Sequence, residues 1–179
     1  AALLAAGVCS AAEPSPDPCA DLCSEGYPCL QAQVECLVGA DRVREAISSL
    51  KGACAATPGD GGLVRLLAWA YLRSGNEAWA RKRLLEQIEA DPDDAQSRAW
   101  AVWLLVQEGS VGQARRLLDA APPAERVEDR QRLEILDVAL LQLEAKPEEA
   151  RSTLSALPQA DDLYPEDRAL LVDLRRQVL

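Results

Sequence analysis

A period of 34 residues recurs through the middle of the chain, and it constrains the fold more than any other feature. Residues of four kinds repeat at this interval. They are the alanines Ala46, Ala80 and Ala114, the glycines Gly75 and Gly109, the prolines Pro58 and Pro92, and the tryptophans Trp69 and Trp103. Self-similarity at one fixed period is typical of stacked supersecondary units, each too small to bury its apolar face alone. The chain is therefore expected to be a repeat array.

Within one period the pattern indicates two helices joined by a turn. Leu67 and Tyr71 are four residues apart, which places both on one face of a first helix. Gly75 follows, and glycine tolerates the left-handed backbone that commonly ends a helix. A second helix then runs past the small residue Ala80, where two helices can approach closely, until Pro92 ends it. The low content of aromatic residues, 4%, also disfavours a mostly β fold.

This unit resembles the tetratricopeptide repeat, a helix–turn–helix of 34 residues. The clearest copy is 61–94, in which the positions of the family pattern are Val64, Leu67, Ala68, Tyr71, Ala80, Leu84 and Pro92. Two aromatic positions hold aliphatic residues and Ala68 replaces glycine, but the spacing is kept. Looser copies cover 27–60 and 95–121. A fourth is shifted by two residues, because Ala150 follows Ala114 by 36.

The resemblance implies an all-α, right-handed solenoid of three to four repeats over 28–164. A terminal repeat needs a polar cap, and residues 165–179 are expected to form a capping C-terminal helix. Pro122-Pro123 should shorten the second helix of the third copy. In that copy Arg98 stands where an apolar residue is expected.

The resemblance also implies a concave groove lined by the first helix of each repeat. The groove positions are Gly62, Arg65, Trp69, Leu72 and Arg73 in one copy and Gln96, Ala99, Trp103, Val106 and Gln107 in the next. Trp69 and Trp103 would form a ladder that anchors a protein partner, and Arg65 and Arg73 would favour an acidic segment of it. Alternatively, a neighbouring helix buries either tryptophan. Trp79 and Trp100 are expected to be packing residues.

The cysteines all lie in the first third of the chain, at Cys9, Cys19, Cys23, Cys29, Cys36 and Cys54. In an exported protein an even number predicts disulfides. In the repeat frame Cys29 would face Cys54 across the first helical pair, and Cys36 would reach back to Cys19 or Cys23. Two alternatives stay open: buried free thiols, and an all-cysteine zinc site made of Cys19, Cys23, Cys29 and Cys36.

The first residues favour export. Residues 1–12 resemble the end of a secretory signal, with an apolar run followed by a small-x-small site at Ala12. Residues 1–8 could instead pack on the first repeat; they are too few to span a bilayer. Residues 13–27, rich in Cys and Pro, would be tied to that repeat. Sixteen Arg against three Lys suggests a GC-rich bacterial genome. We therefore expect a periplasmic, secreted or cell-surface location.

The composition and net charge of the chain narrow the range of functions that it can have. The chain has no His and a net charge of −10. Histidine-based catalysis and histidine metal sites are excluded, and nucleic acid is disfavoured as a partner. No phosphate-binding glycine motif or catalytic constellation is found, so no enzyme activity, cofactor or metal is expected. The sequence favours a protein-interaction scaffold or assembly factor of an extracytoplasmic complex. The alternative is a structural subunit of a large assembly, anchored by its Cys-rich segment.

Overall fold

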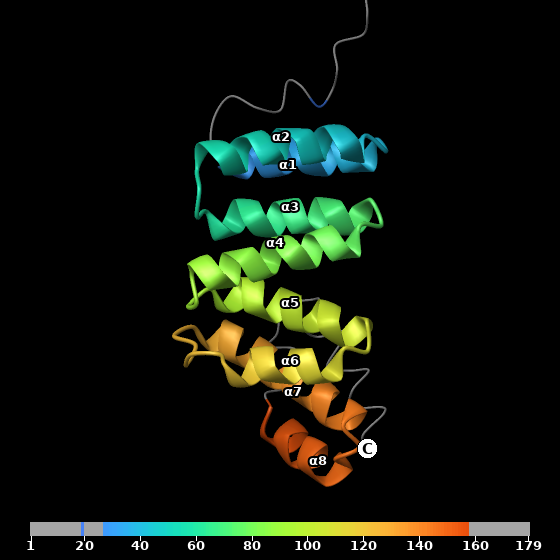
Figure 1. The fold of residues 1–179 in the computed structure, drawn as a ribbon, viewed down its shortest axis with the longest axis vertical. Coiled ribbons are helices and arrows are strands. Elements are labelled where there is room, and N and C mark those ends of the chain that lie inside the picture. Colours follow the sequence, from blue (N-terminus) through green and yellow to red (C-terminus); the bar gives the residue numbers. More distant parts are fainter. Residues whose placement is uncertain (1–18, 20–26, 158–179) are drawn as a thin grey trace, which may run out of the picture.

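The computed structural model describes residue 19 and residues 27–157 of the 179. Those residues form helices and no strand. The helices are α1 (Tyr27–Gly39), α2 (Val43–Ala56), α3 (Gly61–Arg73), α4 (Glu77–Ala90), α5 (Ala95–Gln107), α6 (Val111–Asp119), α7 (Val127–Leu143) and α8 (Pro147–Ala156). They stack as consecutive antiparallel pairs along the long axis of the molecule, from α1–α2 at one end to α8 at the other (Figure 1). The expected all-α repeat architecture is confirmed.

The turn inside each pair has one geometry, repeated four times. Its central residue has a left-handed backbone, with φ of 60° at Asp41, 74° at Gly75, 70° at Gly109 and 58° at Ala145. The next residue donates its amide N–H to the carbonyl five positions earlier, for example from Asn76 to Tyr71 at 2.9 Å. This bond satisfies a carbonyl at the end of the first helix. The intervals are 34, 34 and 36 residues, which fixes the register of the fourth repeat.

Small residues lie where the two helices of each pair cross. Ala46, Ala80, Ala114 and Ala150 occupy the same position of α2, α4, α6 and α8, and each is fully buried. A larger side chain at these positions would push the helices apart, because the interior is close-packed. Buried valines and leucines of the neighbouring helices complete an apolar core that continues from one pair to the next.

Arg98 confirms that the third repeat departs from the pattern. Its side chain is buried in α5, and its guanidinium donates to the Leu117 carbonyl at 3.0 Å and to the Pro92 carbonyl at 2.9 Å. Burial lowers the pKa of Arg98. The guanidinium therefore joins the α4–α5 turn to the last turn of α6. That helix ends at Asp119, just before Pro122-Pro123, as expected.

The ends of the chain lie outside the described residues. This applies to the predicted extension at 1–12, to almost all of the segment 13–27 and to the capping helix at 165–179. Among the described residues, no helix is long and apolar enough to cross a membrane.

Candidate functional site

Trp69 and Trp103 occupy equivalent positions on the first helices α3 and α5, but their surroundings differ. Trp69 is half-buried and packs against the core of the first repeats. Trp103 is 39% exposed, an unusual state for so large an apolar side chain. The predicted ladder therefore has one partly covered member and one that is open to solvent.

Other apolar side chains on the first helices are also partly exposed. Leu72 on α3 and Val106 on α5, both predicted groove residues, are half-buried. Leu143 on α7 is 51% exposed and occupies the position that Gln107 holds one repeat earlier. We call Trp69, Leu72, Trp103, Val106 and Leu143 the first-helix surface. The surface position of Leu143 could not be predicted from the sequence, because the register of the fourth repeat depends on the turn at Ala145.

Two other predicted groove residues differ in their exposure to solvent. Ala99 is only 2% exposed, because it packs with Leu133 and Leu136 of α7, so a partner cannot contact it to any useful extent. Gln107 is exposed at the end of α5. Of these predicted groove residues, Trp103 and Gln107 are therefore exposed to solvent and Ala99 is buried.

Arg65 is paired within the molecule. Its guanidinium lies 2.8 Å from the carboxylate of Asp94, the N-cap residue of α5. The same carboxylate accepts from the Ser97 backbone N–H at 2.9 Å and from the Ser97 hydroxyl at 2.7 Å. The charge of Arg65 is therefore balanced within the molecule, and its contact with an acidic partner stays a prediction. Arg73, by contrast, is exposed and makes no ion pair with any residue in 27–157.

The other two tryptophans were expected to be packing residues. Trp100 is half-buried against the core, in agreement with that interpretation. Trp79 is 47% exposed, so the expectation is wrong there. Its ring lies in the first turn of α4 and stacks on the buried ring of Tyr71, with centroids 6.2 Å apart and planes at 22°. Tyr71 covers one face of Trp79 and the Lys82 ammonium lies 5.1 Å from the ring centre, so the ring is exposed only in part.

A hollow of about 390 Å³ opens between α6, the 120–126 connection and α7. Arg115, on its wall, is hydrogen-bonded to Asp137 at 2.5 Å and to Glu144 at 2.8 Å. Arg115 is therefore paired within the molecule, whereas Arg130, which also lines the hollow, is exposed. The sequence pattern does not predict this hollow. It arises because α6 ends just before Pro122-Pro123 and leaves room beside α7.

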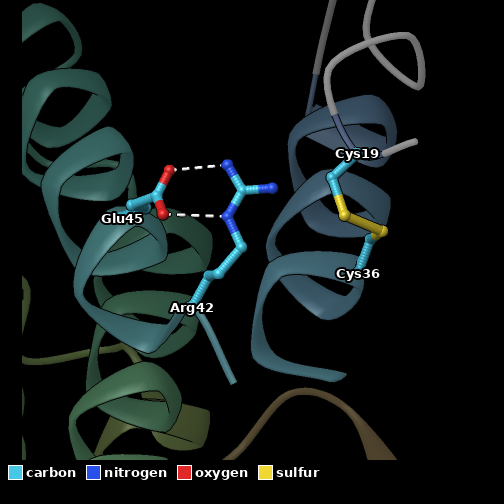
Figure 2. The surroundings of a disulfide bond; sticks show 4 residues. All are labelled: Cys19, Cys36, Arg42 and Glu45. Carbon is cyan, nitrogen blue, oxygen red and sulfur yellow. Dashed lines mark hydrogen bonds and ion pairs between the residues drawn. A yellow bond between two sulfur atoms is a disulfide. The ribbon is translucent and has the colours of Figure 1, made fainter. Parts of the chain in front are cut away.

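A disulfide joins Cys19 to Cys36 on α1, with the two Cα atoms 5.7 Å apart (Figure 2). Nearby, Arg42 and Glu45 form a two-bond ion pair at the start of α2. The expectation that Cys36 reaches back to Cys19 or Cys23 is confirmed for Cys19. Two of the four sulfurs of the alternative zinc site are thereby bonded to each other.

The predicted Cys29–Cys54 bond is wrong. Cys54 has a free thiol, whereas Cys29 is disulfide-bonded, so the two are not bonded to each other. The helical pattern placed Cys29 and Cys54 at the same end of the first pair. It could not predict that Cys29 bonds to a different cysteine. Burial raises the pKa of the Cys54 thiol, although Arg83 works against this shift.

Stacked antiparallel helical pairs with one repeated turn define a helical-repeat protein, a class that binds other proteins along extended surfaces. Residues 37–99 match the tetratricopeptide repeat family, from the end of α1 to the first turn of α5. Residues 37–99 therefore consist of tetratricopeptide repeats, and this fold is that of protein-interaction scaffolds. No curated protein and no solved structure gave a match in the same comparisons.

Proposed function

We propose that this protein is an interaction scaffold, an assembly or accessory factor, that holds a helix or an extended segment of a partner along its first-helix surface. The exposure of Trp103 supports this most directly. A tryptophan that is 39% exposed on a rigid helix leaves a large apolar area in water, and interface hot spots are enriched in such side chains. Covering it with a partner removes that unfavourable exposure.

The neighbouring side chains suggest the chemistry of the partner. Leu72, Val106 and Leu143 extend the apolar area beyond Trp103, while Arg73 supplies a positive charge at the end of α3. A matching segment would present apolar side chains at intervals and an acidic residue near Arg73. Rim charges of this kind act mainly on orientation and on the rate of association.

We also propose an extracytoplasmic location, in the periplasm or at the surface of a bacterium. The Cys19–Cys36 bond supports it, because structural disulfides persist in oxidising compartments and are rare in the cytosol. The partner would then be a component of an envelope or extracellular complex. Fractionation of the producing cells tests this: recovery in the cytosol with reduced Cys19 and Cys36 would contradict it.

The test of the binding surface is a comparison of partners recovered by affinity purification with the wild-type chain and with Trp103→Ala. Trp100→Ala is the matched control, since Trp100 lies on the same helix but packs against the core. Each variant is first shown to be folded by circular dichroism. Loss of the same partner from Trp103→Ala only is expected. Retention of that partner by Trp103→Ala would contradict the proposal.

A further inference from the structure

The second exposed tryptophan, Trp79, belongs to a different face of the molecule. Its ring rests on Tyr71, which lies two residues after Trp69 on α3. Two residues turn an α-helix by about 200°, so Tyr71 and Trp69 point to nearly opposite sides of α3. A partner held at Trp69 and Trp103 would therefore leave Trp79 uncovered.

Lysines flank the aromatic pair. The Lys82 ammonium lies 5.1 Å from the centre of the Trp79 ring, and the Lys51 ammonium lies 5.8 Å from the centre of the Tyr71 ring. Both distances are within the range of cation–π attraction. Lysine from α2, tyrosine from α3, and tryptophan and lysine from α4 thus form one cluster. We call Lys51, Trp79 and Lys82 the second-helix patch, since α2 and α4 are the second helices of their repeats.

Residues 42–83, which contain this cluster, differ from the rest of the chain in their net charge. Residues 42–83 contain eight Arg and Lys against three Asp and Glu, a net charge of +5 in a chain whose total is −10. Several of these cations are balanced. Arg65 pairs with Asp94, Arg81 with Glu108, and Lys82 and Arg83 share Glu86.

Two cations on the outer face of α2 are not balanced in this way. Lys51 and Arg44 are both exposed. They are seven residues apart, which places them on one side of the helix. Neither makes an ion pair with a residue in 27–157. Glu45, the acidic residue of that helix, is bonded to Arg42. The surface beside Trp79 is therefore positive as well as aromatic.

We propose that the second-helix patch is a second docking surface, which takes an acidic segment of a partner protein. The exposed part of the Trp79 ring would receive an apolar side chain, while the unbalanced cations Lys51 and Arg44 would face carboxylates. The stack on Tyr71 fixes the Trp79 ring before binding, which reduces the entropy lost when a partner orders it. A scaffold with two such faces could hold two partners at once.

The experiment measures binding of a fluorescein-labelled peptide in which Asp and Glu alternate with Leu, by fluorescence anisotropy. A peptide with Lys in place of the acidic residues is the control ligand. The wild-type chain should bind the acidic peptide alone, and more weakly as salt is raised. Trp79→Ala, and separately Lys51→Glu with Lys82→Glu, should each weaken binding about tenfold or more.

Two matched variants should leave the affinity unchanged. Arg116→Glu makes the same kind of charge change at an exposed position of α6, and Trp100→Ala removes a tryptophan of α5 that belongs to neither proposed surface. The two proposals are tested with substitutions on different surfaces, Trp79→Ala here and Trp103→Ala for the first-helix surface. Each proposal can therefore fail while the other stands.

Several results would overturn the proposal. One is binding of the acidic peptide that neither patch variant weakens, and another is no binding at all. Binding to phosphatidylglycerol vesicles but not to the peptide would indicate a lipid surface instead. Self-association of the wild-type chain that the Lys51→Glu, Lys82→Glu variant abolishes would assign the patch to a second copy of this chain.

Discussion

The guanidinium of Arg65 on α3 lies 2.8 Å from the carboxylate of Asp94, the N-cap of α5, so one ion pair joins the first helices of consecutive repeats. The carboxylate is held in place from its own side by Ser97 and is only 8% exposed. A group so enclosed has little room to move. Its position also requires that the residue opposite it, Gly61, have no side chain.

We therefore expect Gly61→Ala to destabilise the protein. A Cβ at position 61 would overlap the Asp94 carboxylate, which cannot retreat without breaking its bonds to Arg65 and Ser97. The cost should be about 1–3 kcal/mol, as for other overpacked sites. Gly52→Ala in α2 is the matched control. It meets nothing within 4 Å and should stabilise the helix by about 0.5–1 kcal/mol. Urea denaturation of the two variants measures both effects, and equal effects would refute this account of Gly61.

The disulfide on α1 gives the next prediction. Cys19–Cys36 closes a loop with a sequence separation of 17, which contributes about 3 kcal/mol through the unfolded chain. Cys36→Ser should therefore lower the melting temperature measurably. Cys54→Ser, a free and half-buried thiol, should lower it far less. In the unreduced, folded protein, mass spectrometry should find slow alkylation at Cys54 and none at Cys36. Alkylation at Cys36 would contradict the pairing.

The cysteines also show what the sequence could and could not predict. The period of 34, the helical pairs and the turns follow from local pattern, since spacing and turn residues set them directly. The bond of Cys29 involves a residue outside the repeat pattern, and the helical pattern carries no information about that choice. The free thiol of Cys54 is the consequence.

The binding residues show a similar limit. Exposure depends on neighbours that are distant in sequence. Ala99 is covered by α7, Arg65 is neutralised by Asp94, and Trp79 is only half covered by Tyr71. Repeat position alone could identify Trp103 as a surface residue, because no neighbouring side chain happens to close over it.

A carboxylate at the α7–α8 turn should make stability depend on pH. Hydrogen bonds from Arg115 and Lys146 lower the pKa of Glu144 below its ordinary value. A lowered folded-state pKa adds stability above the unfolded-state pKa, and this stability is lost as pH falls through the folded-state pKa. Glu144→Gln should thus destabilise the protein at neutral pH, and the difference from wild type should vanish in acid.

The size of that effect should be modest, about 0.5–1 kcal/mol, because the ion pair lies near the surface. Urea denaturation of wild type and variant across a pH series measures it. Glu89→Gln, at an exposed position of α4, is the control and should match wild type throughout. A difference for Glu144→Gln that stays constant into acid would show that its charge is not the cause.

The fourth turn offers a stabilising substitution. Ala145 has a φ of 58°, a left-handed conformation that the equivalent residues Gly75 and Gly109 adopt without a Cβ. Ala145→Gly should therefore stabilise the protein by about 1 kcal/mol. Ala78→Gly, at an exposed position in the first turn of α4, should have the opposite effect. Thermal unfolding of both variants decides the matter, and a lower melting temperature for Ala145→Gly would contradict the assigned backbone.

The central claim is that a partner protein lies along the first-helix surface, and site-specific photo-crosslinking tests it most directly. A photoreactive phenylalanine analogue is placed at position 103, at position 143, and at the exposed Arg116 of α6 as the control. The account predicts crosslinks to one partner from positions 103 and 143 and none from 116. Crosslinks from position 116 alone, with none from 103 or 143, would contradict it.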